Sequence, residues 1–407
     1  MKKINVFFLF LISYLTLFGQ VENYQFSREC LDVKDDWHRI ELPLDVYAHL
    51  RSDFSDVRIF ARSADGQISE APYMLTQKDD EWKKQKVDFE LLNKSFDGKG
   101  HYFTFALPEK KTINEIDLKF QQNNFDWKVQ LEGSHNQKEW FTILQDYQII
   151  SIENERMDYS YSKLEFDKSD YPYYRVLVKG KDKPELRSAT IFNIDFEPGI
   201  FREYSDFTFE VEELPEKKQT KVLLVFPQPV PITQFEIEVD EEYDFYRKMQ
   251  TWYKKDSVES ELGWSSRYDF LGTSSLNSIE KSIFPIREVW SDELKIRIDN
   301  EDNKPLNIEG FKVRGPIHNL VARFDDPSTY HLYYGNPNAR KPKYDIARFA
   351  DKIPESNILL NLGPLRTHQV NEESSKAFFT NVNWLYAIMG VIILILGFFT
   401  IRMMKTR

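Results

Sequence analysis

The sequence predicts a mostly β protein, with tandem antiparallel β-sandwich domains followed by one C-terminal transmembrane helix. Short segments alternate apolar and polar residues, which is typical of strands with one buried face. Clusters of Gly, Asp and Asn separate these segments at short intervals, as in antiparallel sandwiches. An uncharged stretch of 18 residues, 384–401, lies near the C-terminus. With 407 residues, the chain is long enough for several domains.

The alternation is clearest at residues 113–120 and 235–239, which we expect to be strands. Turns are expected at 97–100, 132–134 and 300–303. The hydrophobic fraction of 41% and the aromatic fraction of 15% are enough for buried cores and suit strand-rich domains. The composition therefore predicts ordered β domains.

A repeat is visible in the middle of the chain. Pro108 and Pro227 are 119 residues apart, and so are Ile113 and Ile232. Residues 87–90, Trp140 and the Lys-Pro pair at 183–184 have counterparts at 207–210, Trp264 and 304–305, at offsets of 120, 124 and 121. The constant order predicts two copies of one domain, 77–198 and 199–316, with Trp140 and Trp264 at equivalent buried positions. Chance similarity between alternating strands is the alternative.

Two further segments flank the copies. Residues 20–76 contain strand-like segments at 37–47 and 56–60, and we expect a small N-terminal β-unit that packs on the first copy. Residues 317–382 contain one more strand near 330–337 and then a polar stretch. We expect this part to be a juxtamembrane β/stalk segment.

The N-terminus has the pattern of an export signal. Lys2 and Lys3 precede a mainly apolar run at 4–18, and Gly19 supplies a small residue for cleavage before Gln20. Residues 1–19 are therefore predicted to be a signal peptide. An uncleaved N-terminal anchor is the alternative, although the apolar run is short for that role.

The C-terminus has the pattern of a single membrane span, predicted at 383–402. Its 18 uncharged residues would be about 27 Å long as a helix, close to the thickness of the hydrocarbon layer. Basic residues follow the span and Glu372 and Glu373 precede it, so the positive-inside rule places residues 403–407 in the cytoplasm. The expected location is the cell (inner) membrane, single-pass, with the N-terminal domains in the periplasm. A buried core helix is the alternative.

Composition argues against several functions. The net charge of −11 disfavours binding to nucleic acid phosphates. The single Cys30 cannot form an internal disulfide, and the charged residues before it disfavour lipid attachment. The seven His residues include no pair at helical metal-ligand spacing, and the sequence has no phosphate loop or nucleophile elbow. We therefore expect no cofactor, no metal, no catalytic residue and no enzyme activity.

Residues 299–303 place side-chain oxygen atoms at alternate positions, as calcium loops do, but we expect a solvated turn rather than a calcium loop.

Residues 125–134 and 136–140, an aromatic strand, a Glu-Gly-Ser turn and a Trp, resemble the central strand and turn of discoidin-like, galactose-binding-like jelly-roll domains. The whole chain resembles a bacterial family, domain-of-unknown-function family 3999. That resemblance rests on residues 42–47, 56–60, the Glu-Gly-Ser turn, 332–336 and the terminal span. It implies a periplasmic, β-rich protein with one membrane anchor and supplies no catalytic residues. The second copy lacks the Glu-Gly-Ser turn and so departs from the discoidin pattern.

Two loops at equivalent places in the copies are candidates for a ligand surface. Each combines an aromatic residue with amide, carboxylate or guanidinium groups, which suits stacking on a sugar ring and hydrogen bonding to its hydroxyls. We expect Phe125 and Trp127 to pack in the core. The candidate ligand residues are Asn123, Asn124, Asp126, Tyr243, Asp244 and Arg247.

These features favour a non-enzymatic, membrane-anchored interaction protein that binds another envelope or inner-membrane protein through its tandem domains. The alternative is a carbohydrate-binding module for envelope or extracellular glycans. An envelope hydrolase is a third possibility, for which the sequence offers no recognisable site. Weaker capture of a partner after substitution of the loop residues would support binding, whereas turnover of an envelope polymer would support the hydrolase.

Overall fold

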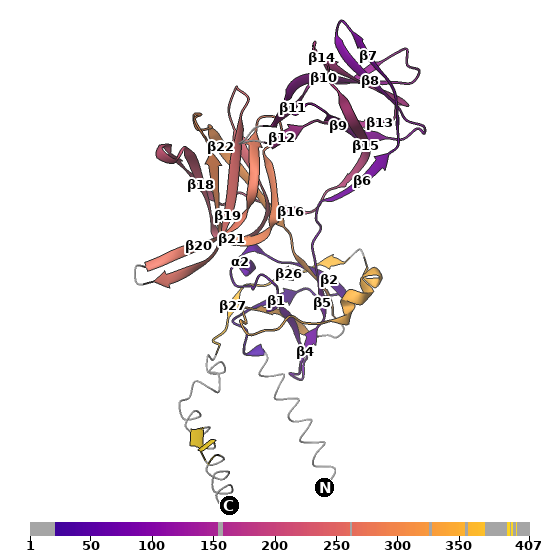
Figure 1. Ribbon diagram of the computed structural model, residues 1–407. Helices are drawn as coiled ribbons and strands as arrows, with labels where there is room; N and C mark the ends of the chain where they lie inside the picture. The colour runs from indigo at the N-terminus through magenta and orange to yellow at the C-terminus, as the bar shows by residue number, and fades with distance from the viewer. Residues whose placement is uncertain are drawn as a thin grey trace, which may run out of the picture.

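The computed structural model describes residues 21–153, 158–260, 263–324, 328–354 and 357–370, together with 389–390, 392–393 and 396. Within these residues the chain is mostly β and forms three units, each with its own buried core (Figure 1). The helical elements described with bounds are short: α2 (Leu44–Tyr47), η1 (Pro215–Lys217) and η2 (Asp345–Lys352).

The first unit, here called the terminal unit, combines strands from both ends of the described chain. One sheet has the order β26-β1-β24-β3-β4, with β27 also paired to β1, and the second has the order β25-β2-β23-β5. The strands are β1 (Phe26–Leu31), β2 (Trp37–Glu41), β3 (Arg58–Arg62), β4 (Ile68–Ala71), β5 (Tyr73–Thr76), β23 (Asn319–Arg323), β24 (Thr329–Tyr334), β25 (Ile358–Leu359), β26 (Asn361–Leu362) and β27 (Arg366–Thr367).

Strands from the late segment occupy central positions in the terminal unit. β24 lies between β1 and β3, and β23 lies between β2 and β5. Ile40, Ile59, Leu320 and Leu332 are buried in one shared core. Residues 20–76 and 317–382 are expected from the sequence to be separate segments, whereas the structure joins the strands of both. Without β23 and β24, the strands β1, β2, β3 and β5 would lack hydrogen-bond partners for their backbone N–H and C=O groups, so the two segments fold together.

The first repeat, 81–197, consists of two facing antiparallel sheets. Their orders are β12-β11-β10-β14-β8-β7 and β13-β9-β15-β6, and apolar residues from both sheets fill one core. The strands are β6 (Glu81–Val87), β7 (Glu90–Asp97), β8 (Gly100–Ala106), β9 (Ile113–Phe120), β10 (Phe125–Ser134), β11 (Phe141–Glu153), β12 (Asp158–Tyr161), β13 (Lys163–Ser169), β14 (Tyr173–Lys179) and β15 (Leu186–Glu197).

The second repeat, 201–316, is one continuous antiparallel sheet that folds around its own core. The order is β16-β22-β18-β21-β19-β20, and β17 also pairs with β18. The strands are β16 (Phe201–Tyr204), β17 (Thr208–Leu214), β18 (Gln219–Val239), β19 (Tyr246–Ser260), β20 (Gly263–Asn277), β21 (Ile283–Asp299) and β22 (Ile308–Pro316).

The two repeats pair their strands in the same pattern. The early half of β18 corresponds to β8, and its late half corresponds to β9. In the same way, the early half of β21 corresponds to β13, and its late half corresponds to β14. The pairs β7·β8, β8·β14, β10·β14 and β10·β11 then correspond to β17·β18, β18·β21, β19·β21 and β19·β20. The pairs β9·β13, β9·β15 and β6·β15 have counterparts in β18·β21, β18·β22 and β16·β22. Apart from β12, which pairs with β11 in the first repeat, the described strands of the two repeats therefore share one order.

The buried positions explain why the sequence offset is constant. Ile113, Ile116 and Leu118 point into the first core. At an offset of 119, Ile232, Phe235 and Ile237 point into the second. Because side chains alternate between the faces of a strand, this offset keeps each apolar residue on the inner face.

The expected equivalence of Trp140 and Trp264 as buried residues is wrong. Trp264 is 72% exposed, near the end of the β19–β20 hairpin, where it is paired with Glu259. The pairing of β19 with β21 stops at Tyr253, so the outer part of the hairpin extends past the sheet and its core. Trp140 is only half-buried, and the Arg175 guanidinium lies 4.1 Å from the centre of its ring.

The two predicted export and membrane segments lie almost wholly outside the described residues. The signal peptide at 1–19 is not among them, and of the span at 383–402 only five residues are. No helix in the described part of the chain is both long and apolar enough to cross a membrane.

A hydrogen-bonded network joins the terminal unit to the second repeat. The Tyr47 hydroxyl is 3.0 Å from Nδ1 of the buried His318, and Nε2 of His318 is 3.3 Å from the Glu288 carboxylate. The Trp290 indole N–H donates to the same carboxylate at 2.8 Å, and its ring packs against Tyr47. Burial alone would raise the pKa of Glu288, but the hydrogen bonds from His318 and Trp290 hold it below its ordinary value.

We expect Leu332→Ala to destabilise the terminal unit by about 2–5 kcal/mol, because Leu332 is fully buried at the centre of β24. Amide hydrogen exchange of the neighbouring strand β1 should accelerate accordingly. Lys341→Ala, a change at an exposed residue that follows β24 in the chain, should leave the exchange rate of β1 nearly unchanged. Equal rates in the two variants would show that β24 does not stabilise this sheet.

Acid should weaken the junction through Glu288. Since its pKa is lower in the folded protein, its contribution to stability is present above the pKa of an unfolded Glu, about 4.3, and is lost as the pH falls through the folded value. Thermal unfolding between about pH 6 and pH 3 should therefore show a smaller pH dependence in Glu288→Gln than in the wild type. Glu216→Gln, at an exposed site, is the control. Identical pH profiles for the wild type and Glu288→Gln would rule out this role.

Candidate functional site

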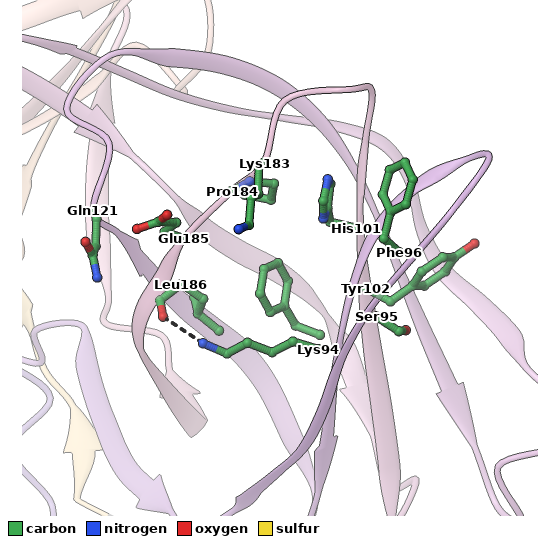
Figure 2. A pocket seen from close by; sticks show the side chains of 11 residues that line it. Lys94, Ser95, Phe96, His101, Tyr102, Gln121, Lys183, Pro184, Glu185 and Leu186 are labelled. Carbon is green, nitrogen blue, oxygen red and sulfur yellow. Dashed lines mark hydrogen bonds between the residues drawn. The ribbon is translucent and has the colours of Figure 1, made fainter.

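Three loops meet at one end of the first repeat and enclose a pocket of about 450 Å³ (Figure 2). They are the end of the β7–β8 hairpin, the loop between β9 and β10, and the loop between β14 and β15. The lining residues are Lys94, Ser95, Phe96, His101, Tyr102, Phe103, Gln121, Lys183, Pro184, Glu185 and Leu186.

The β7–β8 hairpin supplies the aromatic wall of this pocket. Phe96 and His101 face each other across the hairpin, with ring centres 4.6 Å apart. The Phe96 side chain is 62% exposed, and Figure 2 shows His101 between it and Pro184. The turn is stabilised where the Asp97 carboxylate accepts from the backbone N–H of Lys99 at 2.8 Å. An exposed phenyl ring is therefore held in place beside an imidazole.

Hydrogen bonds to the β9–β10 loop fix the opposite wall. The Gln122 amide donates to the Lys183 carbonyl at 2.9 Å and accepts from the Glu185 N–H at 3.1 Å. Beneath this loop, the Trp127 indole N–H donates to Asp182 at 3.2 Å. Lys94 donates to the Leu186 carbonyl at 3.2 Å, drawn as the dashed line in Figure 2. Both walls of the pocket are thus positioned without a ligand.

The groups that line the pocket can bind a small polar molecule that has one apolar face. Phe96 offers a flat ring for stacking, while the imidazole, ammonium, amide and carboxylate of His101, Lys183, Gln121 and Glu185 can donate and accept hydrogen bonds. The volume falls within the range of about 300–1,000 Å³ typical of small-molecule sites.

The predicted loop 123–126 lies beside this pocket, and its own polar side chains are on the surface. Asn123, Asn124 and Asp126 are exposed. Asn124 accepts from the Glu153 N–H at 2.9 Å, and Asp126 accepts from the Gln148 amide at 2.9 Å. Two of the three predicted ligand groups therefore already bond to β11.

The expectation for the two aromatic residues of this loop agrees with the structure. Trp127 is buried in the core of the first repeat, and Phe125 is partly buried against that core. The two rings stack with centres 4.2 Å apart. They support the loop from below.

Asn123 lines a second, more polar cleft of about 760 Å³ that reaches the second repeat. Near this cleft, the Tyr159 hydroxyl donates to Glu280 at 2.9 Å, and the Tyr159 ring lies 5.1 Å from that of Tyr246. Burial and the neighbouring Glu280 carboxylate raise the pKa of Tyr159, which keeps its proton available for this bond. The cleft thus lies where β12 of the first repeat contacts the second.

In the second predicted loop, Arg247 is not a surface residue. Tyr243 and Asp244 are exposed, and Asp244 accepts from the Ser278 hydroxyl at 3.0 Å. Arg247 is only 6% exposed, because the alternation along β19 places it on the same face as the buried Met249. The prediction that Arg247 belongs to an exposed ligand surface is wrong.

No family model matches this chain. The solved structures that resemble it include a glycoside hydrolase 29 family member from an unknown rumen bacterium, at 13% identity and a TM-score of 0.19, covering 54% of this chain and 40% of that one. They also include the CBM32-1 and CBM32-2 domains of Clostridium perfringens ZmpB, at 7% identity and a TM-score of 0.20, covering 63% and 94%. A fucolectin from Morone saxatilis serum has 9% identity and a TM-score of 0.19, covering 62% and 100%. TM-scores this low support neither a shared fold nor a shared ligand.

Sequence reasoning missed the residues that form the pocket in Figure 2. The turn at 97–100 was recognisable, but the pairing of Phe96 with His101 depends on the register of the hairpin. The Lys-Pro pair at 183–184 was recognisable as a repeated element.

Within the described residues, no group of three or more His, Cys, Asp or Glu side chains could hold a metal ion.

We expect Gln122→Ala to loosen the loop that carries Lys183 and Glu185, because it removes two hydrogen bonds to that loop. Each such bond contributes about 1 kcal/mol, so the loss of both, about 2 kcal/mol, should make amide exchange at Glu185 roughly thirty times faster. Gln121→Ala keeps the backbone bond from residue 121 to the Glu185 carbonyl and serves as the control. The same exchange rate in both variants would mean that Gln122 does not hold the loop.

Proposed function

We propose that the first repeat is a non-catalytic module that binds a neutral carbohydrate in the pocket beside Phe96. The observation that carries this proposal is the exposed phenyl ring held beside His101 and opposite a loop fixed by hydrogen bonds. This assigns the pocket to the kind of ligand expected for discoidin-like, galactose-binding-like domains.

The chemistry of a sugar suits the two walls of the pocket. One face of a pyranose ring presents C–H groups that pack on an aromatic ring, and its hydroxyls donate and accept hydrogen bonds. Phe96 supplies the first contact, and His101 and Glu185 are placed for the second. Leaving a phenyl ring in water costs about 1.5–3 kcal/mol relative to burying it, so a ligand that covers Phe96 would gain part of this free energy.

The composition of the pocket favours binding over hydrolysis. Glu185 is the one carboxylate among its lining residues. Glycoside hydrolysis ordinarily uses a pair of carboxylates on either side of the scissile bond. The pocket therefore supports a binding module and offers no partner carboxylate for an acid–base pair.

A second candidate function is the binding of an envelope or inner-membrane protein, and it would use another surface of the first repeat. Trp82 and Phe196 form a cross-strand pair on β6 and β15, with ring centres 4.2 Å apart, and are 63% and 47% exposed. Exposed aromatic residues of this kind are enriched at protein interfaces, and β6 is an edge strand that can pair further. The predicted C-terminal span would keep either activity at the membrane.

Replacing the aromatic contact should remove carbohydrate binding. Neutral mono- and disaccharides would be screened on an array with the full chain, and the strongest would be titrated by calorimetry. We expect Phe96→Ala and His101→Ala to weaken binding about tenfold or more, since both remove direct contacts. Phe196→Ala, which removes another exposed phenyl ring outside the pocket, should bind like the wild type. The proposal fails if no neutral sugar binds, or if Phe96→Ala keeps full affinity.

A further inference from the structure

The second repeat carries a cationic pocket on the outer face of its sheet, away from the site proposed above. It has a volume of about 360 Å³ and combines four basic side chains with two aromatic rings. This concentration of positive charge stands out in a protein with a net charge of −11. Its lining residues are Leu214, Lys217, Gln219, Lys221, Trp252, Tyr268, Lys295 and Arg297.

Strand pairing forces the positive charges together. Lys221 on β18 lies directly opposite Arg297 on β21, and Lys295 is two residues before Arg297 on the same face. Like charges directly opposite each other destabilise a sheet. Burial and the charge of Lys221 lower the pKa of Lys295, which reflects this crowding.

The protein supplies little negative charge to offset this cluster. Glu212 forms an ion pair with Lys221 at 2.9 Å, and the nearby Glu293 accepts from Tyr268 and Lys254. Among the described residues, no carboxylate lies within ion-pair distance of Lys217, Lys295 or Arg297. Three cations at this pocket therefore have no ion-pair partner in the described part of the chain.

The first repeat shows how the same positions look when the charge is balanced. Arg175 occupies the place of Lys295, and the opposite residue on the neighbouring strand is Glu132, which accepts from Arg175 at 2.6 and 2.8 Å. In the second repeat Trp252 stands opposite Lys295, where the first repeat has Glu132. An aromatic ring has thus replaced the counter-charge.

A second difference between the repeats adds positive charge. Arg297 occupies the place of Leu177, as the pairing of each residue with Gln250 or Gln130 shows. The fold therefore does not require either the extra cation or the missing carboxylate at these positions. Both changes act in the same direction and favour an anion from outside the protein.

The aromatic rings define what kind of anion would fit. The Lys295 ammonium lies 3.3 Å from the centre of the Tyr268 ring, and the Arg297 guanidinium lies 5.1 Å from that of Trp252. A bare phosphate ion would contact the cations and leave the apolar surface of Leu214 and Trp252 uncovered. A sugar ring that bears a carboxylate would use both, packing on the rings and pairing its charge with the cations.

We propose that this pocket binds a carboxylate-bearing sugar unit of an acidic polysaccharide. Lys295 and Arg297 pair with the carboxylate, and Trp252 packs against the sugar ring. The site is separate from the pocket beside Phe96 and does not depend on the function proposed for it.

The test uses the full chain in detergent micelles and calorimetry with trigalacturonate as the probe. We expect Lys295→Gln and Arg297→Gln each to weaken binding about tenfold or more, since each removes a charge-assisted hydrogen bond. Lys255→Gln is the matched control, because Lys255 is an exposed lysine on β19 that pairs with Asp269 outside the pocket. Affinity should also fall as salt increases. No binding by the wild type, or an equal loss in Lys255→Gln, would overturn the proposal.

A further variant and probe separate this site from simpler explanations. Trp252→Glu copies the arrangement of Arg175 and Glu132, so it should abolish trigalacturonate binding while the protein keeps its thermal stability. Inorganic phosphate should bind far more weakly than trigalacturonate, and equal affinity would exclude recognition of a sugar. Phe96→Ala should leave trigalacturonate binding unchanged, which distinguishes failure here from failure of the neutral-sugar site.

Discussion

The arrangement of the protein depends on strand pairing between the two ends of the described chain. The terminal unit has no complete sheet until β23 and β24 have entered it between strands from the first 76 residues. The repeats lie between these segments, and each has its own core. They can therefore form their own contacts before the terminal unit closes. The entropic cost of closing the long loop between the two end segments rises only slowly with loop length. The second repeat is held to the terminal unit by the Arg202–Glu41 ion pair, and to the segment before β6 by Arg314 and Asp80, which are 2.6 Å apart.

The sequence predicted those parts of the fold that depend on local periodicity. Inward positions alternate along each strand, so Ile113 and Ile232 could be matched without knowing which strands pair. The terminal unit could not be predicted in this way, because nothing in the pattern at 37–47 indicates that its neighbour lies near residue 320. Trp264 was misplaced for a related reason: its burial depends on how far β21 extends beside β19, which is a property of another strand.

The candidate sites were harder to predict than the fold. Phe96 and His101 meet only because their hairpin has a particular register, and each alone is an ordinary strand residue. Arg247 belonged to a loop correctly identified as polar, but it begins the inward alternation of β19 and is therefore buried. The partner of Lys295 is likewise set by the pairing of β19 with β21. A pocket on a sheet is lined by residues that pair across strands, and the strand register that sets these pairs cannot be read from one sequence.

Comparing the two repeats separates what the fold requires from what a ligand would require. The inner faces keep apolar residues at matching positions, because a change there would leave a cavity or a buried polar group in the core. On the outer faces, the first repeat has an Arg175–Glu132 ion pair where the second has a Lys295–Trp252 pair, and none of these four residues belongs to the two cores. Two modules that recognise different parts of one glycan would act together, since binding at the first site raises the effective concentration at the second. A tandem repeat with unlike binding sites thus has a physical advantage over two identical copies when the ligand is a mixed polymer.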